Sequence, residues 1–267
     1  MKKYLSLLKY EFKTILKDSM NAVILVYPLI ILFITAFLLP GIVDKTTDSS
    51  GNDATISLLI GFTLSLALGG FIMGVLLGFS LLENKDENTI MNIQATPVEL
   101  SGYTMFKIIY VYVLAIFSNI IMVGGLKLFA SDKYVVDYGD ATVHLLDAIS
   151  YGQIVVFALV ASMIVPMIAL VLASIAKNKV EGFAFMKSGA LFILIPMLTL
   201  LNAFQDGKQY ILGLLPNFWT IKPLLNEALG LSNSSNLSFY GYLGIGVVYS
   251  VILSVLCLRF FLRRAKA

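Results

Sequence analysis

The stretch ISLLIGFTLSLALGGFIMGVLLGFSLL, residues 56–82, decides the fold class. Its 27 residues include no Asp, Glu, Lys, Arg or His. An α-helix needs about 20 mostly apolar residues to cross the hydrocarbon layer of a bilayer. We therefore expect a membrane-spanning helix that tilts or extends beyond the lipid.

Five other stretches of the chain have the same apolar character. The six predicted spans cover residues 22–39, 56–82, 108–126, 154–176, 183–203 and 240–262. Hydrophobic residues make up 58% of the 267 residues and charged residues 13%, whereas soluble domains average roughly 45–50% and 25%. The sequence predicts one domain, residues 1–267, that is an all-α integral membrane protein with six transmembrane helices.

The basic residues predict the orientation in the membrane. Of the 19 lysines and arginines, 14 fall on the side that holds both chain ends in the six-span scheme, and every arginine is among them. Cytoplasmic loops carry an excess of basic residues, so we expect both termini in the cytoplasm. The basic balance indicates contact with the head groups of a lipid bilayer and requires no nucleic acid.

Residues 1–20 precede the first span and predict an amphipathic helix that lies on the inner leaflet. Leu5, Leu8 and Phe12 recur at helical spacing, and Lys9 and Lys13 lie on an opposite stripe. Such a helix buries its apolar stripe at the lipid boundary and directs its lysines toward phosphate groups. A solvated lead-in to the first span is the alternative, but it would leave the apolar stripe in water.

The inner connection between spans two and three, residues 83–107, predicts a short helix at the membrane surface. Ile90 and Ile93 would share one side of that helix. Thr96 can then cap a new helix, with Pro97 at its first position. A helix held in this way suits docking to a soluble partner, and an ordinary capped loop explains the same residues equally well.

The outer segment, residues 204–239, is apolar but broken by Pro216 and Pro223. Each proline interrupts the helical hydrogen-bond ladder. Trp219 and Lys222 lie between them and are typical anchors at a lipid–water boundary. We expect a broken, partly re-entrant or interfacial structure, because a seventh complete span would place the C-terminal arginines outside.

Three glycines in the second span form a stripe of small residues. Gly70, Gly74 and Gly78 recur every four residues, and such a stripe allows another helix to approach closely. The partner helix can belong to the same chain or to a second subunit, and packing within the chain is the expectation.

The sequence contains no motif for catalysis. It has no G-x-x-x-x-G-K-S/T phosphate loop, no H-E-x-x-H zinc pair and no G-x-S-x-G elbow, which are the patterns that carry such chemistry. With one cysteine, Cys257, and one histidine, His144, a His/Cys metal cluster is excluded. We expect no catalytic, cofactor-binding or metal-ligating residue, and an external source of energy for any transport.

Four segments resemble the ABC transporter type 2 permeases, the membrane subunits of bacterial ABC exporters. They are the N-terminal amphipathic helix; Glu87, Asn88, Thr89, Ile90 and Met91 followed by residues 95–98 and Lys107; residues 178–187, which lead into span five with its Pro196; and residues 215–219 before span six. The resemblance covers essentially the whole chain, and the run 178–187 is its most specific part.

The resemblance implies two permease copies that pair as a dimer on two cytoplasmic ATPase subunits, which bind ATP and Mg²⁺, in the plasma membrane. It implies that the segment between spans two and three is the coupling helix. The implied coupling residues are Glu87, Thr89, Ile90, Met91, Ile93, Thr96 and Pro97. The turn between spans four and five, with Lys179, Glu181, Gly182 and Lys187, is implied to help set the coupling geometry; the positive-inside rule alone explains its two lysines equally well.

The cargo is expected to be amphipathic or hydrophobic, such as a peptide, a toxin or a drug-like molecule. The spans are rich in aromatic residues and methionine and nearly free of charge, which suits such a cargo but also suits helices that simply face lipid. The alternatives are a non-transporting immunity or sensor subunit, a membrane-embedded enzyme, or export of a lipid or polysaccharide precursor.

Overall fold

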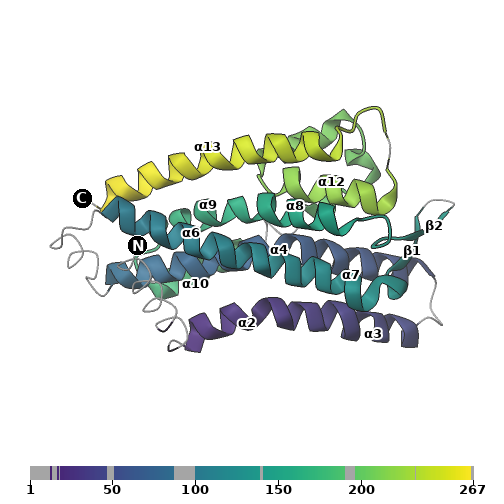
Figure 1. The fold of residues 1–267 in the computed structure, drawn as a ribbon, viewed down its shortest axis with the longest axis horizontal. Coiled ribbons are helices and arrows are strands. Elements are labelled where there is room, and N and C mark those ends of the chain that lie inside the picture. Colours follow the sequence, from purple (N-terminus) through teal and green to yellow (C-terminus); the bar gives the residue numbers. More distant parts are fainter. Residues whose placement is uncertain are drawn as a thin grey trace.

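The computed structural model describes residues 13, 17, 19–46, 51–86, 100–138, 141–189, 196–231 and 233–265. Within these residues the long helices run along one direction and form an elongated bundle (Figure 1). A β-hairpin and the short helix α12 lie toward one end of the bundle, and α10 lies toward the other (Figure 1). We call these the hairpin end and the α10 end.

The helices of the first half, in chain order, are α2 Ser19–Phe33, the π-helix η1 Ile34–Leu38, α3 Leu39–Thr46, α4 Gly51–Asp86, α6 Leu100–Asn119, the π-helix η2 Ile120–Gly124, α7 Gly125–Ala130 and the 3₁₀ helix η3 Ser131–Lys133. Strands β1 Val135–Tyr138 and β2 Ala141–His144 follow. The second half contains α8 Tyr151–Ala161, the 3₁₀ helix η4 Ser162–Ile164, α9 Val165–Ile175, α10 Lys179–Ser188, the 3₁₀ helices η5 Asn202–Phe204 and η6 Gly207–Leu214, α12 Phe218–Leu229 and α13 Phe239–Ala265.

Five of the predicted spans are confirmed as helices long and apolar enough to cross a membrane. They are Asn21–Asp44, Asp53–Glu83, Gly102–Lys133, Tyr151–Ile175 and Phe239–Arg264. Each contains the stretch expected from the sequence to within one residue and extends up to seven residues past either of its ends. The helices exceed the apolar runs because polar residues at their ends continue the same hydrogen-bond ladder into the interface.

The remaining predicted span, residues 183–203, is not one continuous helix in the part of the chain that the structure describes. Helix α10 is capped at Gly189, and residues 202–204 form a 3₁₀ turn. Residues 190–195 lie outside the described residues. The sixth span therefore stays a prediction.

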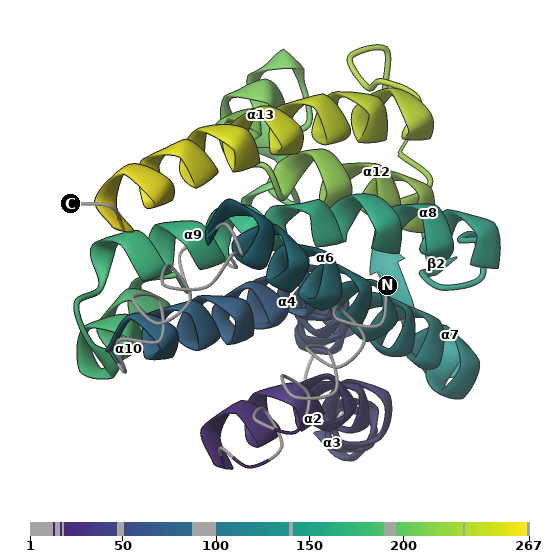
Figure 2. The same cartoon turned by 60° about the vertical axis from the view of Figure 1, so that its left-hand side comes forward.

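Helix α4 lies at the centre of the bundle and packs against α2, α6 and α9 (Figure 2). A Cβ atom at Gly70 would lie 2.9 Å from the backbone oxygen of Ala161, and one at Gly74 would lie 2.8 Å from Cβ of Ile168. Gly78 makes the same kind of approach to the side chain of Leu172. The glycine stripe thus packs against Ala161, η4 and α9. This confirms the expectation that the stripe packs within the chain.

Three of the spans change helix type near their middle. The span of α8 and α9 narrows to the 3₁₀ helix η4 just before Pro166. Proline has no N–H to donate to the carbonyl four residues earlier, here that of Ser162, so an α-helical ladder cannot continue through this point. The spans that contain η1 and η2 each widen to a π-helix.

The β-hairpin was not predicted and is an addition to the all-α class. Strands β1 and β2 pair antiparallel, with Val135 opposite His144 and Tyr138 opposite Ala141. Tyr134, just before β1, is fully buried, and its hydroxyl donates a hydrogen bond of 2.8 Å to the backbone oxygen of Thr35. This contact joins the hairpin to the first span.

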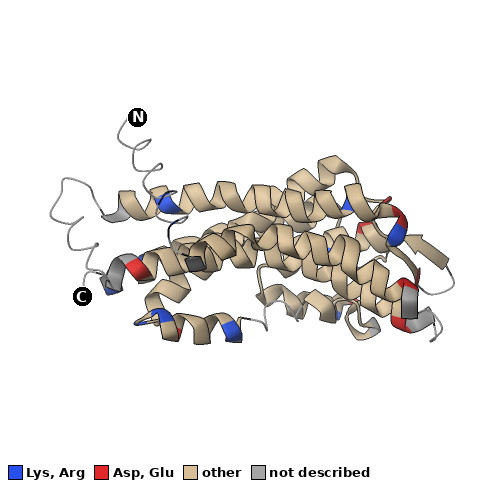
Figure 3. Cartoon of the chain, turned by 90° about the horizontal axis from the view of Figure 1, so that it is seen from below, with Lys and Arg blue, Asp and Glu red and all other residues tan. Residues whose placement is uncertain are grey.

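Charged side chains gather at the two ends of the bundle, and the middle is nearly free of them (Figure 3). This distribution fits an apolar belt between two polar surfaces. The α10 end carries both described arginines of the last helical turn, Arg263 and Arg264.

Candidate functional site

An ion pair joins the ends of two helices at the α10 end of the bundle. The Nζ atom of Lys179, the first residue of α10, lies 2.9 Å from Oε1 of Glu83, near the end of α4. The Glu83 side chain is only 18% exposed, and that of Lys179 is 41% exposed. The pair is therefore partly shielded from water, which strengthens it relative to a fully exposed pair.

The turn that precedes α10 positions Lys179. Asn178 is the N-cap residue, and its side chain accepts a hydrogen bond of 2.9 Å from the backbone N–H of Glu181. The Glu181 carboxylate in turn accepts a bond of 2.8 Å from the backbone N–H of Lys177. Hydrogen bonds of this kind between side chains and backbone fix the first turn of a helix. They therefore hold the backbone of Lys179 in place at the start of α10.

Gly182 brings α10 into close contact with α4. A Cβ atom at Gly182 would lie 2.8 Å from Cε1 of Phe79, and the rings of Phe79 and Phe183 have centroids 5.0 Å apart. Lys187, at the other end of α10, is exposed. Of the four residues predicted for this turn, Lys179, Glu181 and Gly182 thus act together in joining α10 to α4, and Lys187 does not.

Two further polar contacts lie in the same half of the bundle. Lys107 of α6 is 2% exposed and donates a hydrogen bond of 2.9 Å to the Ser80 hydroxyl of α4. Its Nζ also lies 5.1 Å from the centroid of the Tyr103 ring. Arg264 of α13 donates a bond of 2.8 Å to the backbone oxygen of Ser174 in α9. Polar contacts therefore connect α4 to α6 and to α10, and α9 to α13.

The predicted coupling residues lie outside the described residues. These are Glu87, Thr89, Ile90, Met91, Ile93, Thr96 and Pro97. Leu5, Leu8, Lys9 and Phe12 of the predicted interfacial helix also lie outside them, and Lys13 is described as helical and exposed. Helix α4 continues into the predicted connection between spans two and three and ends at Asp86, directly before Glu87, the first of the predicted coupling residues.

At the hairpin end, the outer segment folds back into the bundle. Pro216 separates η6 from α12, and Pro223 lies inside α12. The indole Nε1 of Trp219 donates a hydrogen bond of 2.8 Å to the backbone oxygen of Gly213, which fastens α12 to η6. The expected break at Pro216 is present, and α12 continues through Pro223.

Lys222 does not anchor at a lipid–water boundary, contrary to expectation. Its side chain is 1% exposed, with Nζ 3.4 Å from Oε1 of Gln205. The residues around Lys222 are typical of an interfacial anchor. However, α12 packs against α8, α13 and α4, and Lys222 lies on the side of α12 that these helices cover.

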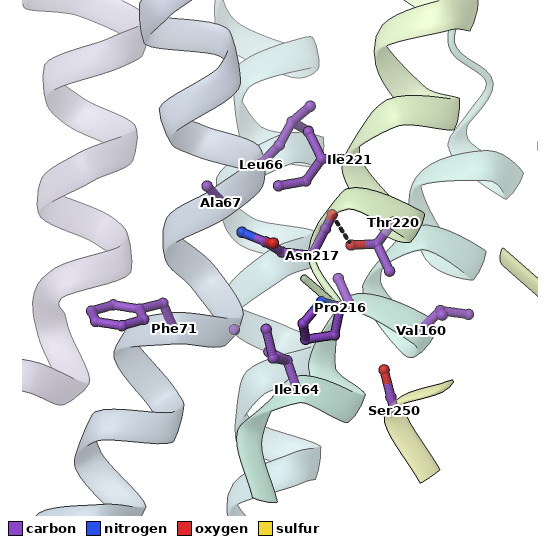
Figure 4. A pocket seen from close by; sticks show the side chains of 12 residues that line it. Leu66, Ala67, Phe71, Val160, Ile164, Pro216, Asn217, Thr220, Ile221 and Ser250 are labelled. Carbon is purple, nitrogen blue, oxygen red and sulfur yellow. Dashed lines mark hydrogen bonds between the residues drawn. The ribbon is translucent and has the colours of Figure 1, made fainter. Parts of the chain in front are cut away.

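A small cavity of about 20 Å³ lies where α12 begins (Figure 4). It is lined by Asn217 and Thr220 from the start of α12 and by apolar side chains such as Leu66 and Phe71 of α4. The hydroxyl of Thr220 donates a hydrogen bond of 3.0 Å to the backbone oxygen of Asn217. Because Leu66 and Phe71 lie in the middle of α4, α12 starts at mid-bundle depth.

A polar contact that the sequence did not reveal lies in the middle of the apolar spans. The amide nitrogen of Asn119, the last residue of α6, donates a bond of 3.1 Å to the hydroxyl of Ser162 in η4. A Cβ atom at Gly69 of α4 would lie only 2.2 Å from Oδ1 of Asn119. Gly69 and Asn119 are 50 positions apart in the chain. Nothing local in the sequence therefore indicates that the glycine makes room for the asparagine.

The arrangement defines a class of protein: a helical bundle that spans the membrane, with an apolar middle, polar junctions at both ends and no group of three or more His, Cys, Asp or Glu side chains that could hold a metal ion among the described residues. A family model described as fluoroquinolones export permease protein Rv2686c-like matches residues 11–136 and 140–258. The chain belongs to this family of ABC-2-type exporter permeases. No curated protein shows a significant match to it.

Proposed function

We propose that this chain is the membrane subunit of an ATP-driven exporter that moves an amphipathic, drug-like molecule out of the cell, and that a separate ATPase subunit hydrolyses the ATP. The family match over nearly the whole chain carries the proposal. The family is described by fluoroquinolone export, which favours a drug-like cargo over a peptide among the cargoes that the sequence left open.

The contacts of α4 support a route for the coupling. Two ATPase subunits would dock on the segments that follow Asp86 in two permease copies. Glu83 lies only three residues before that end of α4 and pairs with Lys179. A displacement of the coupling segment would then move α4 and, through the ion pair and the contact at Gly182, would also move α10.

The test uses the full-length chain, co-expressed with a candidate ATP-binding-cassette subunit from the same genome and reconstituted in liposomes. We expect ATP-dependent movement of ciprofloxacin, followed by its own fluorescence, and no movement with the permease alone. Co-purification of the ATPase without transport would indicate an immunity or sensor subunit, and transport without the ATPase would contradict the proposal.

Aspartate at Ile90 and Ile93 tests the predicted docking surface in the same assay. We expect loss of ATPase stimulation, at least ten-fold, because the charges would lie on the apolar side that docks. Gln94→Asp adds a charge at a polar position of the same segment and should retain most of the stimulation. If the Ile90 and Ile93 variants bind the ATPase and stimulate it normally, the docking assignment is wrong.

A further inference from the structure

A cavity of about 270 Å³ lies between α6 and α13, where both helices pack against η4 and α9. Met163 of η4 and Pro166 of α9 line it. Its two sides are formed by Met105, Ile109 and Tyr112 of α6 and by Val251, Val255 and Leu258 of α13. The cavity therefore lies among three of the five helices that are long and apolar enough to cross a membrane.

The surface of this cavity is apolar. Ser250, Ser254 and Tyr112 also line it, but none of their three hydroxyl groups is exposed to the cavity. The Tyr112 hydroxyl donates a hydrogen bond of 3.0 Å to the backbone oxygen of Leu159 in α8. A polar group inserted here would lose its hydrogen bonds to water and would find no partner, so the part of a ligand that enters this cavity is hydrocarbon.

The cavity extends from the middle of the bundle toward the α10 end. On α6 its lining residues run from Tyr112 back to Met105, in the second turn of that helix. On α13 they run from Ser250 to Leu258, two turns before the end of that helix. The hydrogen bond of Tyr112 joins α6 to α8 at the mid-bundle end of the cavity. A hydrocarbon chain in the cavity thus occupies one half of the bundle, as a lipid tail of one leaflet does.

A basic residue follows the cavity at the α10 end. Arg259 comes directly after Leu258 and lies one helical turn after Val255 on α13. Residues four positions apart share one face of a helix, so Arg259 continues the row of Val251 and Val255. Its side chain is exposed and forms no ion pair or hydrogen bond with the other described residues. The guanidinium can therefore bind an anionic group at the head of a chain that fills the cavity.

The charge of α13 at this end favours a head group with a net negative charge. The helix has three arginines in its last two turns and no Asp or Glu along its length. One of them, Arg264, donates a hydrogen bond of 2.8 Å to the backbone oxygen of Ser174. Clusters of basic residues next to a span attract anionic lipid head groups. A zwitterionic head group would bring an ammonium group beside these arginines, with no carboxylate on α13 to pair with it.

We propose that this cavity binds one acyl chain of an anionic phospholipid from the leaflet at the α10 end, with the lipid phosphate on Arg259. A drug-like cargo is a poorer match, because its polar groups would find no partner on the apolar wall. Lipid binding requires only the folded chain and does not depend on the ATPase partner or on transport. The proposal can therefore fail while the proposed export function stands, and the reverse also holds.

The experiment is native mass spectrometry of the purified full-length chain in a non-ionic detergent, after co-purified lipid has been removed. The probes are palmitoyl-oleoyl-phosphatidylglycerol, which is anionic, and palmitoyl-oleoyl-phosphatidylcholine, which has the same two chains and no net charge. The two lipids differ in mass, so the fraction of chains that carry each is measured directly. We expect one tightly bound phosphatidylglycerol, with a Kd at least five-fold lower than that of phosphatidylcholine.

Two pairs of variants locate the bound lipid. Arg259→Gln should raise the Kd for phosphatidylglycerol at least five-fold, whereas Arg263→Gln, one turn further along α13 and also exposed, should leave it within two-fold. Val251→Phe places a ring in the cavity and should raise the Kd by a similar factor. Ile252→Phe is its matched control, because Ile252 is 52% exposed, close to the 46% of Val251, and does not line the cavity.

A further measurement does not rely on variants that could fold poorly. On the unaltered chain, decyl phosphate should displace phosphatidylglycerol at concentrations at which decanol and glycerol phosphate do not, because only decyl phosphate carries both the chain and the phosphate. Equal affinity for the two phospholipids, equal displacement by the three competitors, or an equal effect of Arg259→Gln and Arg263→Gln would each overturn the proposal.

The same spectra report the two other possible occupants of the cavity. Displacement of phosphatidylglycerol by ciprofloxacin would make the cavity a cargo site. A dimer that Val251→Phe dissociates and Ile252→Phe does not would place a second copy of the chain against it. Either result would overturn the lipid assignment.

Discussion

At the residue scale, the ion pair of Glu83 and Lys179 is held by two different means. Lys179 is fixed by the capped turn at Asn178, and Glu83 is fixed by the continuous helix α4. Partly exposed pairs contribute only about 0.2–1 kcal/mol to stability. The role of this pair is therefore better tested by measuring ATPase-driven transport than by measuring the free energy of unfolding.

Charge reversal tests that role. Glu83→Lys and Lys179→Glu should each reduce ATPase-driven transport several-fold, because like charges would separate α4 from α10. The double variant restores an attractive pair in the opposite order and should recover most of the transport. The measurement is the initial transport rate in proteoliposomes at equal protein content.

Lys187→Glu is the matched control, since Lys187 is on the same helix and is exposed. It should change the transport rate by less than two-fold. If it reduces transport as strongly as Lys179→Glu, the effect comes from the charge of α10 in general, and the specific pair is not the coupling contact.

The family resemblance singled out Lys179, Glu181 and Gly182 in the turn between spans four and five. The sequence did not indicate Glu83 as the partner of Lys179, because the two lie 96 residues apart in the chain. Lys222 was assigned to the lipid boundary from its neighbours, and only the packing of α12 shows that it is buried.

At the element scale, the glycine stripe of α4 sets the spacing to the helix beside it. A methyl group at Gly70 would meet a backbone oxygen, which cannot rotate away as a side chain does. Overpacking of this kind costs about 1–3 kcal/mol.

Gly70→Ala should therefore lower the thermal midpoint of the purified chain by several degrees, measured by the fluorescence of Trp219 or by size-exclusion after heating. Gly102→Ala is the control, because a Cβ atom there would meet nothing within 4 Å; it should leave the midpoint unchanged or raise it slightly. Equal midpoints for Gly70→Ala and the unaltered chain would show that the two helices can separate freely.

Span location was predictable, and span shape was only partly so. An apolar run of sufficient length has few alternatives to a membrane helix, so five stretches were found within a few residues. The 3₁₀ turn of η4 has a local cause in Pro166. The π-helix η1 also ends two residues before a proline, Pro40, whereas neither η2 nor the helix α7 that follows it contains a proline, so η2 has no such signal.

At the scale of the whole molecule, the two bundle ends should lie on opposite sides of the membrane. The basic residues predict that the α10 end is cytoplasmic, and the C-terminal end of α12 would then lie toward the outside. The β-hairpin would lie outside as well. It was missed because four-residue strands between polar residues carry too short a pattern to identify.

Cysteine labelling tests this orientation. After Cys257→Ala removes the single native thiol, Asp147→Cys should react with a membrane-impermeant maleimide added to intact cells, and Lys177→Cys should react only after the membrane is permeabilised. Both positions are exposed, so access to the reagent decides the result. The opposite pattern would invert the topology and move the proposed docking surface outside.

Helix α4 runs without interruption for 36 residues, or about 54 Å at 1.5 Å per residue, while the spans beside it change helical type midway. A rod of that length behaves as a lever: a tilt imposed at its α10 end must reappear at its hairpin end. An antibody fragment that clamps the hairpin end should therefore slow nucleotide hydrolysis at the opposite end of the bundle, without touching any surface of the enzyme that performs it.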